Sequence, residues 1–316
     1  MSVLHPIAGA EALAPAEQLV SIVLTTLNAA TYLRQAVDSC LQQTHGNLEL
    51  IAVDGGSTDG TQGILEAVQD PRLRLVHQER NAGKLPGAIN LGLSQAGGEY
   101  LTWMQADSTY TPDAIERMLG ALERNPAAGQ VYADYCEIDA HGRVTRAVEL
   151  PDPDSFLDAT GDPAGCCFLI RRSVREAVGQ HDVGTFPSHD FDYRMRIALR
   201  FGSVHIREPL YYWRYHAGSL TGRFGWAALA RQCIEIRVAL GLDTTLQARR
   251  RLAQVEMALA FEMYSQGQWK GVPRQVRQGL GLHPGFWRNP GVWSILLKSL
   301  ARSVAARKQP GEYAES

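Results

Sequence analysis

Three apolar runs in the first half of the chain are each followed by residues that can bind a ligand. Thr25 and Thr26 end the first run, Asp54 follows the second, and Asp107 lies just past the third. A carboxylate at the edge of a crevice suits a hard divalent cation such as Mg²⁺, which proteins commonly share with phosphate oxygens. An aspartate there can also cap the helix that follows it. The spacing alone leaves both roles open for Asp107.

The elements that would position these residues alternate between strands and helices. Short apolar runs rich in β-branched residues predict buried strands at residues 19–25, 48–53, 73–77 and 100–104. Apolar residues at helical spacing predict helices at residues 32–41, 61–68, 84–96 and 112–124. Asn28 is expected to cap the first helix and Pro112 to open the last. The alternation predicts an α/β fold whose ligand crevice lies beyond the carboxyl ends of mostly parallel strands.

Charge divides the chain into regions of different character. The 316 residues carry a net charge of −2, with 45% hydrophobic and 20% charged residues, as in an ordinary globular protein. Residues 223–316 hold 14 Lys and Arg against 6 Asp and Glu, whereas residues 1–222 have a net charge of −10. We therefore separate a leader at 1–18, an alternating region at 19–222 and a basic region at 223–316.

Several classes of protein are excluded or disfavoured by missing signals. No apolar run approaches the ~18 residues of a membrane span, and the N-terminus lacks the basic and apolar parts of a signal peptide. The five cysteines include no CxxC pair, which favours buried thiols in a reducing cytoplasm. The motifs GxxxxGK[ST], HExxH and GxSxG are absent, and no GxGxxG joins a strand to a helix.

A set of motifs in residues 19–222 resembles that of family 2 glycosyltransferases in order and spacing. The motifs are VSIVLTTLN at 20–28, LIAVDGGSTDGT at 50–61, RNAG at 80–83, NLGL at 90–93, AGGEYL at 96–101, WMQADS at 103–108, GCCFLIRR at 165–172, SHDFDYRMR at 188–196 and YWRYHAGS at 212–219. The resemblance implies a GT-A catalytic domain at 19–222, a Rossmann-like mixed, mostly parallel sheet flanked by helices. It also implies inverting transfer of a sugar from a nucleotide-diphosphate sugar. The expected donor is a UDP-sugar. The acceptor would be a hydroxyl of a glycan or lipid-linked molecule in cell-surface polysaccharide biosynthesis.

The resemblance assigns a metal site to the end of the fourth predicted strand. Asp107 matches the DxD carboxylate that binds Mg²⁺ or Mn²⁺, and His216 would complete the metal shell or donate to the diphosphate. A structural role is the equal alternative for His216. Gln105 replaces the first DxD carboxylate and Ser108 follows Asp107, so this chain departs from the family pattern.

The resemblance also implies which residues bind the donor. Thr25, Asp54, Gln105 and Asp107 would line the donor site, and Lys84 would reach the diphosphate or else remain a solvated surface lysine. Asp59 is expected to act as a turn or cap residue.

Asp190 corresponds to the family's general base, which takes the proton of the acceptor hydroxyl. Asp192 is expected to be structural, and His189 replaces the usual Glu. The alternative is that both aspartates only complement the dipole of the helix that they begin.

The basic region predicts helices at residues 226–240, 246–264, 272–282 and 292–304. The last helix carries an apolar stripe of Trp293, Leu296, Leu297 and Leu300. Such a stripe most often packs on the protein's own core; the minority alternative is peripheral contact with an anionic membrane surface. The expected location is therefore the cytoplasm, including the inner face of the membrane. Nucleic acid is not an expected partner.

Two other functions compete with the glycosyltransferase hypothesis. A sugar-phosphate nucleotidyltransferase would carry a GxGxR-type loop after the first strand, where this chain has Thr25 to Asn28. A non-catalytic nucleotide-sugar binding module with a degraded metal site is supported by Gln105 and Ser108.

Overall fold

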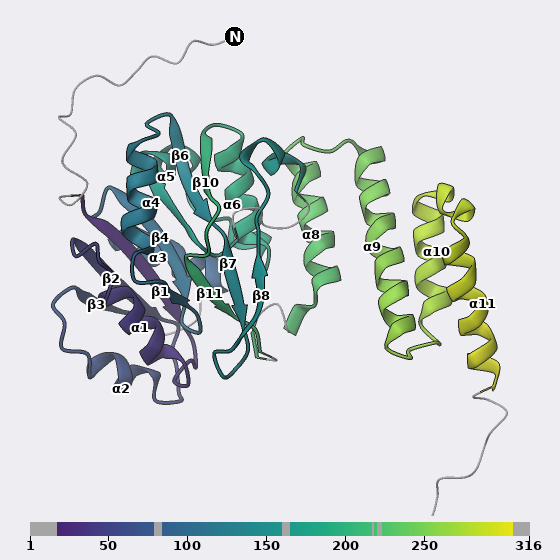
Figure 1. Cartoon of the computed structure of the whole chain (residues 1–316), viewed down its shortest axis with the longest axis horizontal. Helices are drawn as coiled ribbons and strands as arrows, with labels where there is room; N and C mark the ends of the chain where they lie inside the picture. The colour runs from purple at the N-terminus through teal and green to yellow at the C-terminus, as the bar shows by residue number, and fades with distance from the viewer. Residues whose placement is uncertain (1–17, 79–83, 160–164, 217, 220–222, 306–316) are drawn as a thin grey trace, which may run out of the picture. The chain divides into compact units, whose positions relative to one another are not determined.

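The chain divides into two compact units, residues 1–217 and 218–316 (Figure 1). The computed structural model describes residues 18–78, 84–159, 165–216, 218–219 and 223–305. The predicted RNAG motif and residues 1–17 of the leader lie outside the described residues. Each unit is described separately below.

The first unit is built on a seven-stranded sheet with the order β10-β6-β9-β4-β1-β2-β3. The strands β1, β2, β3 and β4 run parallel to one another, and β9 runs antiparallel to both of its neighbours. The bounds are β1 Val20–Thr26, β2 Leu48–Asp54, β3 Leu73–His77, β4 Tyr100–Gln105, β6 Ala128–Ala133, β9 Phe168–Arg171 and β10 Gly202–Ile206. The predicted mixed, mostly parallel sheet is confirmed.

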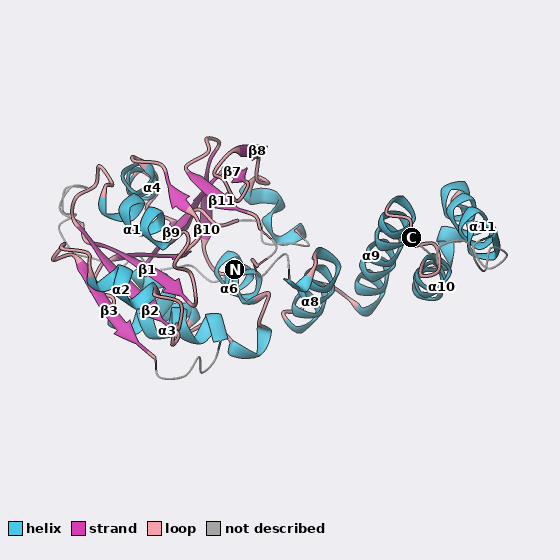
Figure 2. Cartoon of the chain, turned by 90° about the horizontal axis from the view of Figure 1, so that it is seen from below, coloured by secondary structure: helices cyan, strands magenta, loops and turns pink. Residues whose placement is uncertain are grey.

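Helices cover both faces of this sheet (Figure 2). The helices are α1 Leu33–Leu41, α2 Thr61–Glu66, α3 Lys84–Gln95, α4 Ala114–Glu123, α5 Arg172–Val178 and α6 His189–Ala198. Alternate residues of β1 face opposite ways: Ile22 packs in the core that includes α1 and α4, whereas Val23 faces α3. A Cβ on Gly92 of α3 would lie 2.3 Å from Cγ1 of Val23, so only glycine allows this close approach.

The strand register brings the predicted ligand-binding residues to one edge of the sheet. Thr26 pairs with Asp54, and Thr25 pairs with Gln105. The carboxyl ends of β1, β2 and β4 therefore lie side by side. Parallel sheets bind their ligands at these ends.

A second sheet of the first unit borders the loop that follows β4. Its order is β5-β11-β7-β8, with bounds β5 Thr109–Tyr110, β7 Tyr135–Ile138, β8 Val144–Val148 and β11 Tyr211–Arg214. Since β5 directly follows Asp107 and pairs with β11, the loop is held between the two sheets.

Two local predictions about helix starts are wrong. The helix α1 begins at Leu33 with Tyr32 at its N-cap, so Asn28 does not cap it. Asn28 instead has φ 53° and bonds to the loop after β2. The helix α4 begins at Ala114 after an N-cap at Asp113, so Pro112 precedes the helix instead of opening it.

The described part of the second unit contains helices α8 Trp226–Ala239, α9 Thr245–Ser265, α10 Val272–Leu282 and α11 Pro290–Ala305, with the short 3-10 helix η4 Pro284–Arg288 before the last. Val292 and Ile295 of α11 pack with Met257 and Val276 of the two preceding helices. The predicted stripe is buried only in part: Leu296 packs against this cluster, whereas Leu297 and Leu300 are 62% and 45% exposed. Among the described residues, no helix combines the length and the apolar character needed to cross a membrane.

Candidate active site

The loop after β4 holds an aspartate and a histidine side by side. Oδ2 of Asp107 lies 3.2 Å from Nε2 of His216, and Oδ1 accepts a hydrogen bond of 3.0 Å from the Ser108 hydroxyl. The two side chains of this pair remain 23% and 25% exposed. The structure thus brings together the two residues that were predicted as metal ligands. Asp107 does not cap α4, since β5 and Asp113 lie between them.

A buried arginine fixes the backbone of the loop after β4. Arg214 is 4% exposed and donates from Nε to the Asp107 carbonyl over 2.8 Å. Its Nη2 donates to Oε1 of Gln35 over 2.9 Å, and its guanidinium lies 4.4 Å from the centre of the Tyr32 ring. Because the Nε bond ends on the Asp107 carbonyl, Arg214 fixes the backbone of this loop without binding the Asp107 carboxylate.

The pair fits a divalent cation. A carboxylate oxygen and an imidazole nitrogen converge at a partly open position, and Mg²⁺ or Mn²⁺ needs few protein ligands when phosphate oxygens and water supply the rest. At the end of β4, Oε1 of Gln105 is buried without a hydrogen-bond partner among the described residues. This orphaned acceptor is a further oxygen that a bound ligand could satisfy.

Asp54, at the end of β2, is enclosed by protein donors. It is 1% exposed, and its carboxylate accepts hydrogen bonds from Ser57 through N and Oγ and from Nε2 of Gln62. Thr25 is also turned inward, because its hydroxyl donates to the Met104 carbonyl over 3.4 Å. Both predicted donor residues lie at the correct edge of the sheet, with their side chains engaged by protein groups.

Asn28 joins the loops after β1 and β2 into one wall. Its Oδ1 accepts a bond of 2.8 Å from the Thr58 backbone N–H, and its own N–H donates to Oγ of Ser57 over 2.8 Å. Asp59 bonds to Thr61 and to the Ala30 N–H. The hydroxyl of Thr61 holds the pKa of Asp59 below its usual value. Asp59 therefore organises a turn, as the sequence predicted.

Asp190, the predicted base, lies in the first turn of α6. Its Oδ1 accepts a hydrogen bond of 3.0 Å from the indole N–H of Trp103 on β4, and the side chain is 26% exposed. Asp192 differs, because it forms an ion pair of 2.8 Å with Arg196. Arg196 also donates to the Val178 carbonyl. Asp192 thus stabilises the helix and its junction with α5, while Asp190 keeps an accessible oxygen.

Trp103 and His181 are components that the sequence did not assign to the site. The His181 ring meets the Trp103 ring edge-on at 4.6 Å and stacks on Tyr193 at 4.0 Å. Burial, followed by the charges of His189, Arg194 and Arg196, holds the pKa of His181 well below its ordinary value. His181 is therefore a neutral imidazole at neutral pH. Only the folded chain places it near Trp103, so no local sequence signal could have identified it.

Lys84 begins α3 with φ 55°. Its Nζ lies 4.8 Å from the centre of the Phe186 ring. Phe186 belongs to the segment just before α6, so the structure places Lys84 against the segment that leads to Asp190.

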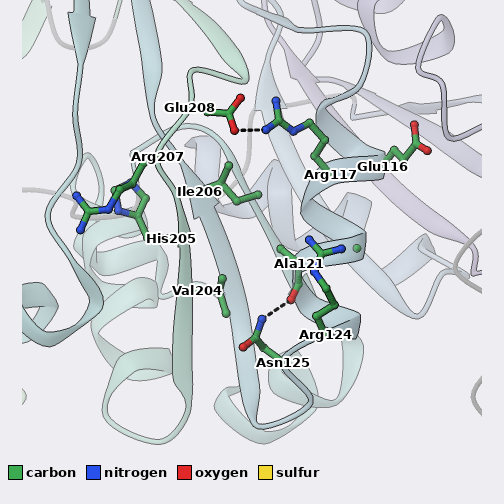
Figure 3. A pocket seen from close by; sticks show the side chains of 11 residues that line it. Glu116, Arg117, Ala121, Arg124, Asn125, Val204, His205, Ile206, Arg207 and Glu208 are labelled. Atoms are coloured by element: carbon green, nitrogen blue, oxygen red, sulfur yellow. Dashed lines mark hydrogen bonds and ion pairs between the residues drawn. The ribbon is translucent and has the colours of Figure 1, made fainter.

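A separate hollow of about 620 Å³ lies between α4 and β10 (Figure 3). It contains none of the predicted site residues. Arg117 pairs there with Glu208, and Arg207 pairs with Asp152. Since these charges are already matched, we assign this hollow no role.

Comparisons with known proteins agree with the geometry at the level of family and fold. The family model described as "Glycosyl transferase family 2" matches residues 21–179. An uncharacterized glycosyltransferase of Rickettsia typhi is 30% identical over 215 residues, which are 64% of this chain and 66% of that protein. Glycosyltransferase GlyG of Streptococcus pneumoniae is 37% identical over 128 residues, which are 39% of this chain and 42% of that protein. Across the first relatives in the comparison, the matched part spans from 28% to 66% of their length.

Two solved structures resemble the fold. One is TarS residues 1–349 of S. aureus in complex with UDP-GlcNAc, with a TM-score of 0.60 and 14% identity, covering 82% of this chain and 79% of that chain. The other is the mannosyltransferase PcManGT of Pyrobaculum calidifontis in complex with GDP-Man and Mn²⁺, with a TM-score of 0.57 and 18% identity, covering 90% and 80%. At these identities the likeness establishes the fold, which is that of GT-A glycosyltransferases.

Proposed function

Because the chain belongs to glycosyl transferase family 2, we propose that it transfers a sugar from a nucleotide-diphosphate sugar to an acceptor hydroxyl with inversion at the anomeric carbon. One observation carries this proposal: β4 and its loop connect two open carboxylates. Trp103 on β4 binds Asp190, and Asp107 follows four residues later. At ~3.3 Å per residue, the Cα atoms of Trp103 and Asp107 are at most about 13 Å apart. A donor diphosphate and a reacting sugar can therefore occupy one crevice between these residues.

The donor side of the proposal rests on Asp107, His216 and Gln105. The first two would hold Mg²⁺ or Mn²⁺, which supplies positive charge against the departing nucleoside diphosphate when it is bound. Gln105 would donate to or accept from the donor at the end of β4. Thr25 and Asp54 would shape the donor wall through the backbone that they fix, and Lys84 would contribute its positive charge. UDP-GlcNAc in TarS and GDP-Man in PcManGT support a nucleotide-sugar donor, and we propose a UDP-sugar.

The acceptor side rests on Asp190. The Trp103 indole occupies its Oδ1, so Oδ2 is the oxygen that can take the proton of the acceptor hydroxyl. The deprotonated oxygen then attacks the anomeric carbon from the side opposite the diphosphate, and the configuration inverts in this single displacement. General-base assistance of this kind is worth ~10²–10⁴-fold in rate.

The biological setting is part of the proposal. The acceptor would be a glycan or lipid-linked hydroxyl in cell-surface polysaccharide biosynthesis, as the family resemblance implies. None of the five cysteines, all of which lie in the described part of the chain, forms a disulfide, and this supports a reducing compartment such as the cytoplasm. Peripheral contact of the second unit with the inner membrane face remains the minority alternative, supported by the net positive charge of residues 223–316.

A non-catalytic nucleotide-sugar binding module is the second candidate. Two observations favour it: the enclosed Asp54 and the glutamine at position 105. Such a module would bind the donor without breaking the bond between the sugar and the diphosphate.

The test is a panel of UDP-, GDP- and dTDP-sugars with and without Mn²⁺. Thermal shift reports binding, because a ligand of the native state raises apparent stability. Release of the nucleoside diphosphate reports turnover, and NMR of the sugar product reports its anomeric configuration. Binding without release would favour the binding module, and a product of retained configuration would overturn the inverting mechanism.

A further inference from the structure

Three metal-ligating side chains gather behind the proposed base. One ligand atom each from His181, His189 and Asp190 can be chosen so that all three lie within 4.8 Å of one another. Nε2 of His189 lies 3.4 Å from Oδ1 of Asp190. His181 comes from the segment after α5, and the other two residues begin α6.

The two histidines present buried ring nitrogens that have no well-formed hydrogen bond. His181 is 3% exposed and His189 is 1% exposed. None of the four ring nitrogens forms a hydrogen bond of good geometry with another described group. The weaker contacts are those of the His181 ring with the His189 backbone and of Nε2 of His189 with Oδ1 of Asp190. A neutral imidazole carries one N–H donor and one nitrogen lone pair, so two such rings bury four polar atoms. Buried polar atoms without partners are unfavourable, and a ligand between these rings would relieve that cost.

The protein holds the three side chains in place from all sides. Asn90 of α3 forms two hydrogen bonds of 2.9 Å with the backbone of His181. Tyr193 stacks on the His181 ring at an angle of 8°. Trp103 fixes the Asp190 carboxylate. The cluster is therefore arranged before any ligand binds, which lowers the entropic cost of binding.

We propose that His181, His189 and Asp190 form a site for a transition-metal dication of the Zn²⁺ type. Two imidazole nitrogens and one carboxylate oxygen are a ligand set that Zn²⁺ accepts, with its fourth position left to water. In a tetrahedral zinc site, bonds of about 2.0–2.1 Å place ligand atoms about 3.4 Å apart. The pair of His189 and Asp190 has this spacing, and the His181 nitrogen lies within 4.8 Å of both ligand atoms.

This site differs from the Asp107–His216 pair in its chemistry. Two buried imidazoles favour Zn²⁺ over Mg²⁺, which prefers oxygen ligands. Zn²⁺ next to Oδ1 of Asp190 would also lower the basicity of this carboxylate, whose Oδ2 takes the acceptor proton in the proposed function. Zn²⁺ would therefore inhibit turnover. This consequence rests on the proposed function, whereas metal binding itself does not.

Direct metal binding tests the site. The full chain would be stripped with a chelator and titrated with Zn²⁺ against a chromophoric chelator. The double substitution Asp107→Asn with His216→Gln would serve as the background, because it removes the other candidate metal site. We expect one Zn²⁺ per chain in this background. His181→Phe, which keeps the aromatic stack and removes both nitrogens, should weaken binding at least tenfold.

His189→Gln is the second ligand variant and should weaken Zn²⁺ binding to a similar extent. His141→Gln, at an exposed turn outside the cluster, is the matched control and should bind as the background does. Zn²⁺ affinity that is absent in the background, or unchanged in either ligand variant, overturns the proposal. Thermal melts confirm that each variant is folded; if His181→Phe does not fold, the result for His189→Gln decides.

Inhibition provides a separate measurement. With Mn²⁺ in excess, added Zn²⁺ should lower the turnover of the parent chain and should affect His181→Phe at least tenfold less. If Asp190→Asn turned over normally, the assigned base would be wrong while the zinc-binding result would stand. If Zn²⁺ bound in the titration but did not inhibit turnover, the proposed effect of the bound metal on Asp190 as a base would be wrong.

Discussion

The end of β2 and the loop after β4 each place an aspartate at the same edge of the sheet, but the two carboxylates differ in their exposure to solvent. Asp54 is surrounded by donors from Ser57 and Gln62 and is 1% exposed. Asp107 is fixed through its backbone, and its carboxylate stays 23% exposed. The position of an aspartate at a strand end therefore does not decide its role. The burial of its carboxylate does: the donors around Asp54 enclose it, whereas Ser108 and His216 leave the Asp107 carboxylate partly exposed.

The two aspartates of α6 also differ in this way, one carboxylate being open and the other enclosed. A further enclosed aspartate lies in the second unit. Asp190 accepts one indole bond and remains 26% exposed, whereas Asp192 is paired with Arg196. Asp243, in the second unit, lies between Arg237 and Arg251. We expect substitution of an open carboxylate to change activity or binding, and substitution of an enclosed carboxylate to change stability.

The largest expected effect concerns Asp190. Asp190→Asn keeps the size of the side chain and removes the base, so turnover should fall by about 10²–10⁴-fold while donor affinity is nearly unchanged. Steady-state release of the nucleoside diphosphate measures the first quantity, and calorimetry measures the second. Asp38→Asn, on an exposed face of α1, is the matched control. Near-native turnover in Asp190→Asn would exclude it as the base.

The next effect concerns the enclosed Asp243. Arg237 and Asp243 are almost fully buried, and two bonds of 2.9 Å join them. Removing one partner of a buried ion pair costs about 3–5 kcal/mol, so Asp243→Asn should lower the free energy of unfolding by that amount. Donor binding in the first unit should not change. Chemical denaturation and calorimetry test the two statements.

Acid should remove the stabilising contribution of Asp243 in the unsubstituted chain, because it protonates the carboxylate. Hydrogen bonds from Arg237 hold the pKa of Asp243 below its ordinary value of 3.8. A carboxyl group whose pKa is depressed in the folded state stabilises the protein above its unfolded pKa. That contribution is lost as the pH falls below 3.8 and through the folded pKa. Asp243→Asn should remove this part of the pH dependence; an identical acid profile in the variant would contradict the assignment.

A smaller effect is expected for the open Asp107. Asp107→Asn should weaken Mn²⁺-dependent donor binding about 10–100-fold, a loss that even indirect partners of a metal can cause. The melting temperature without ligand should be nearly unchanged, because the bonds that fix the loop use the backbone of Asp107. Calorimetry with and without Mn²⁺ measures the binding. Normal metal-dependent binding would show that another group holds the ion.

The smallest effect is expected for Asp54 and has the opposite pattern. Asp54→Asn weakens the bonds that close the turn after β2, at a cost of about 1–3 kcal/mol. For a chain of this size that corresponds to a few degrees in the melting temperature. Donor affinity should fall less than in Asp107→Asn when it is measured well below the melting transition. A larger loss of affinity in Asp54→Asn would show that this carboxylate contacts the donor directly.

The sequence alone predicted four of the seven strands of the first sheet and the edge at which the candidate site lies, but not β6, β9 and β10. Buried strands are continuous apolar runs, so β1, β2, β3 and β4 were predicted to within two residues. The predicted metal ligands also come together, since Asp107 and His216 lie 3.2 Å apart. Local composition is sufficient for the strands, because their apolar pattern extends over a few neighbouring residues; the pairing of Asp107 with His216 was expected only from the family resemblance.

Tertiary structure decided what each polar side chain faces. Asn28 could cap a helix by local rules, but the turn after β2 offered it the Thr58 N–H instead. The sequence assigned Asp54 and Asp107 the same expected role in donor binding. In the folded chain, Ser57 and Gln62 donate to the Asp54 carboxylate and enclose it. His181 meets Trp103 across 78 positions of sequence. Hydrogen bonds and ring contacts depend on distance in space, which the order of residues does not specify; the partners of these side chains therefore emerged only from the folded chain.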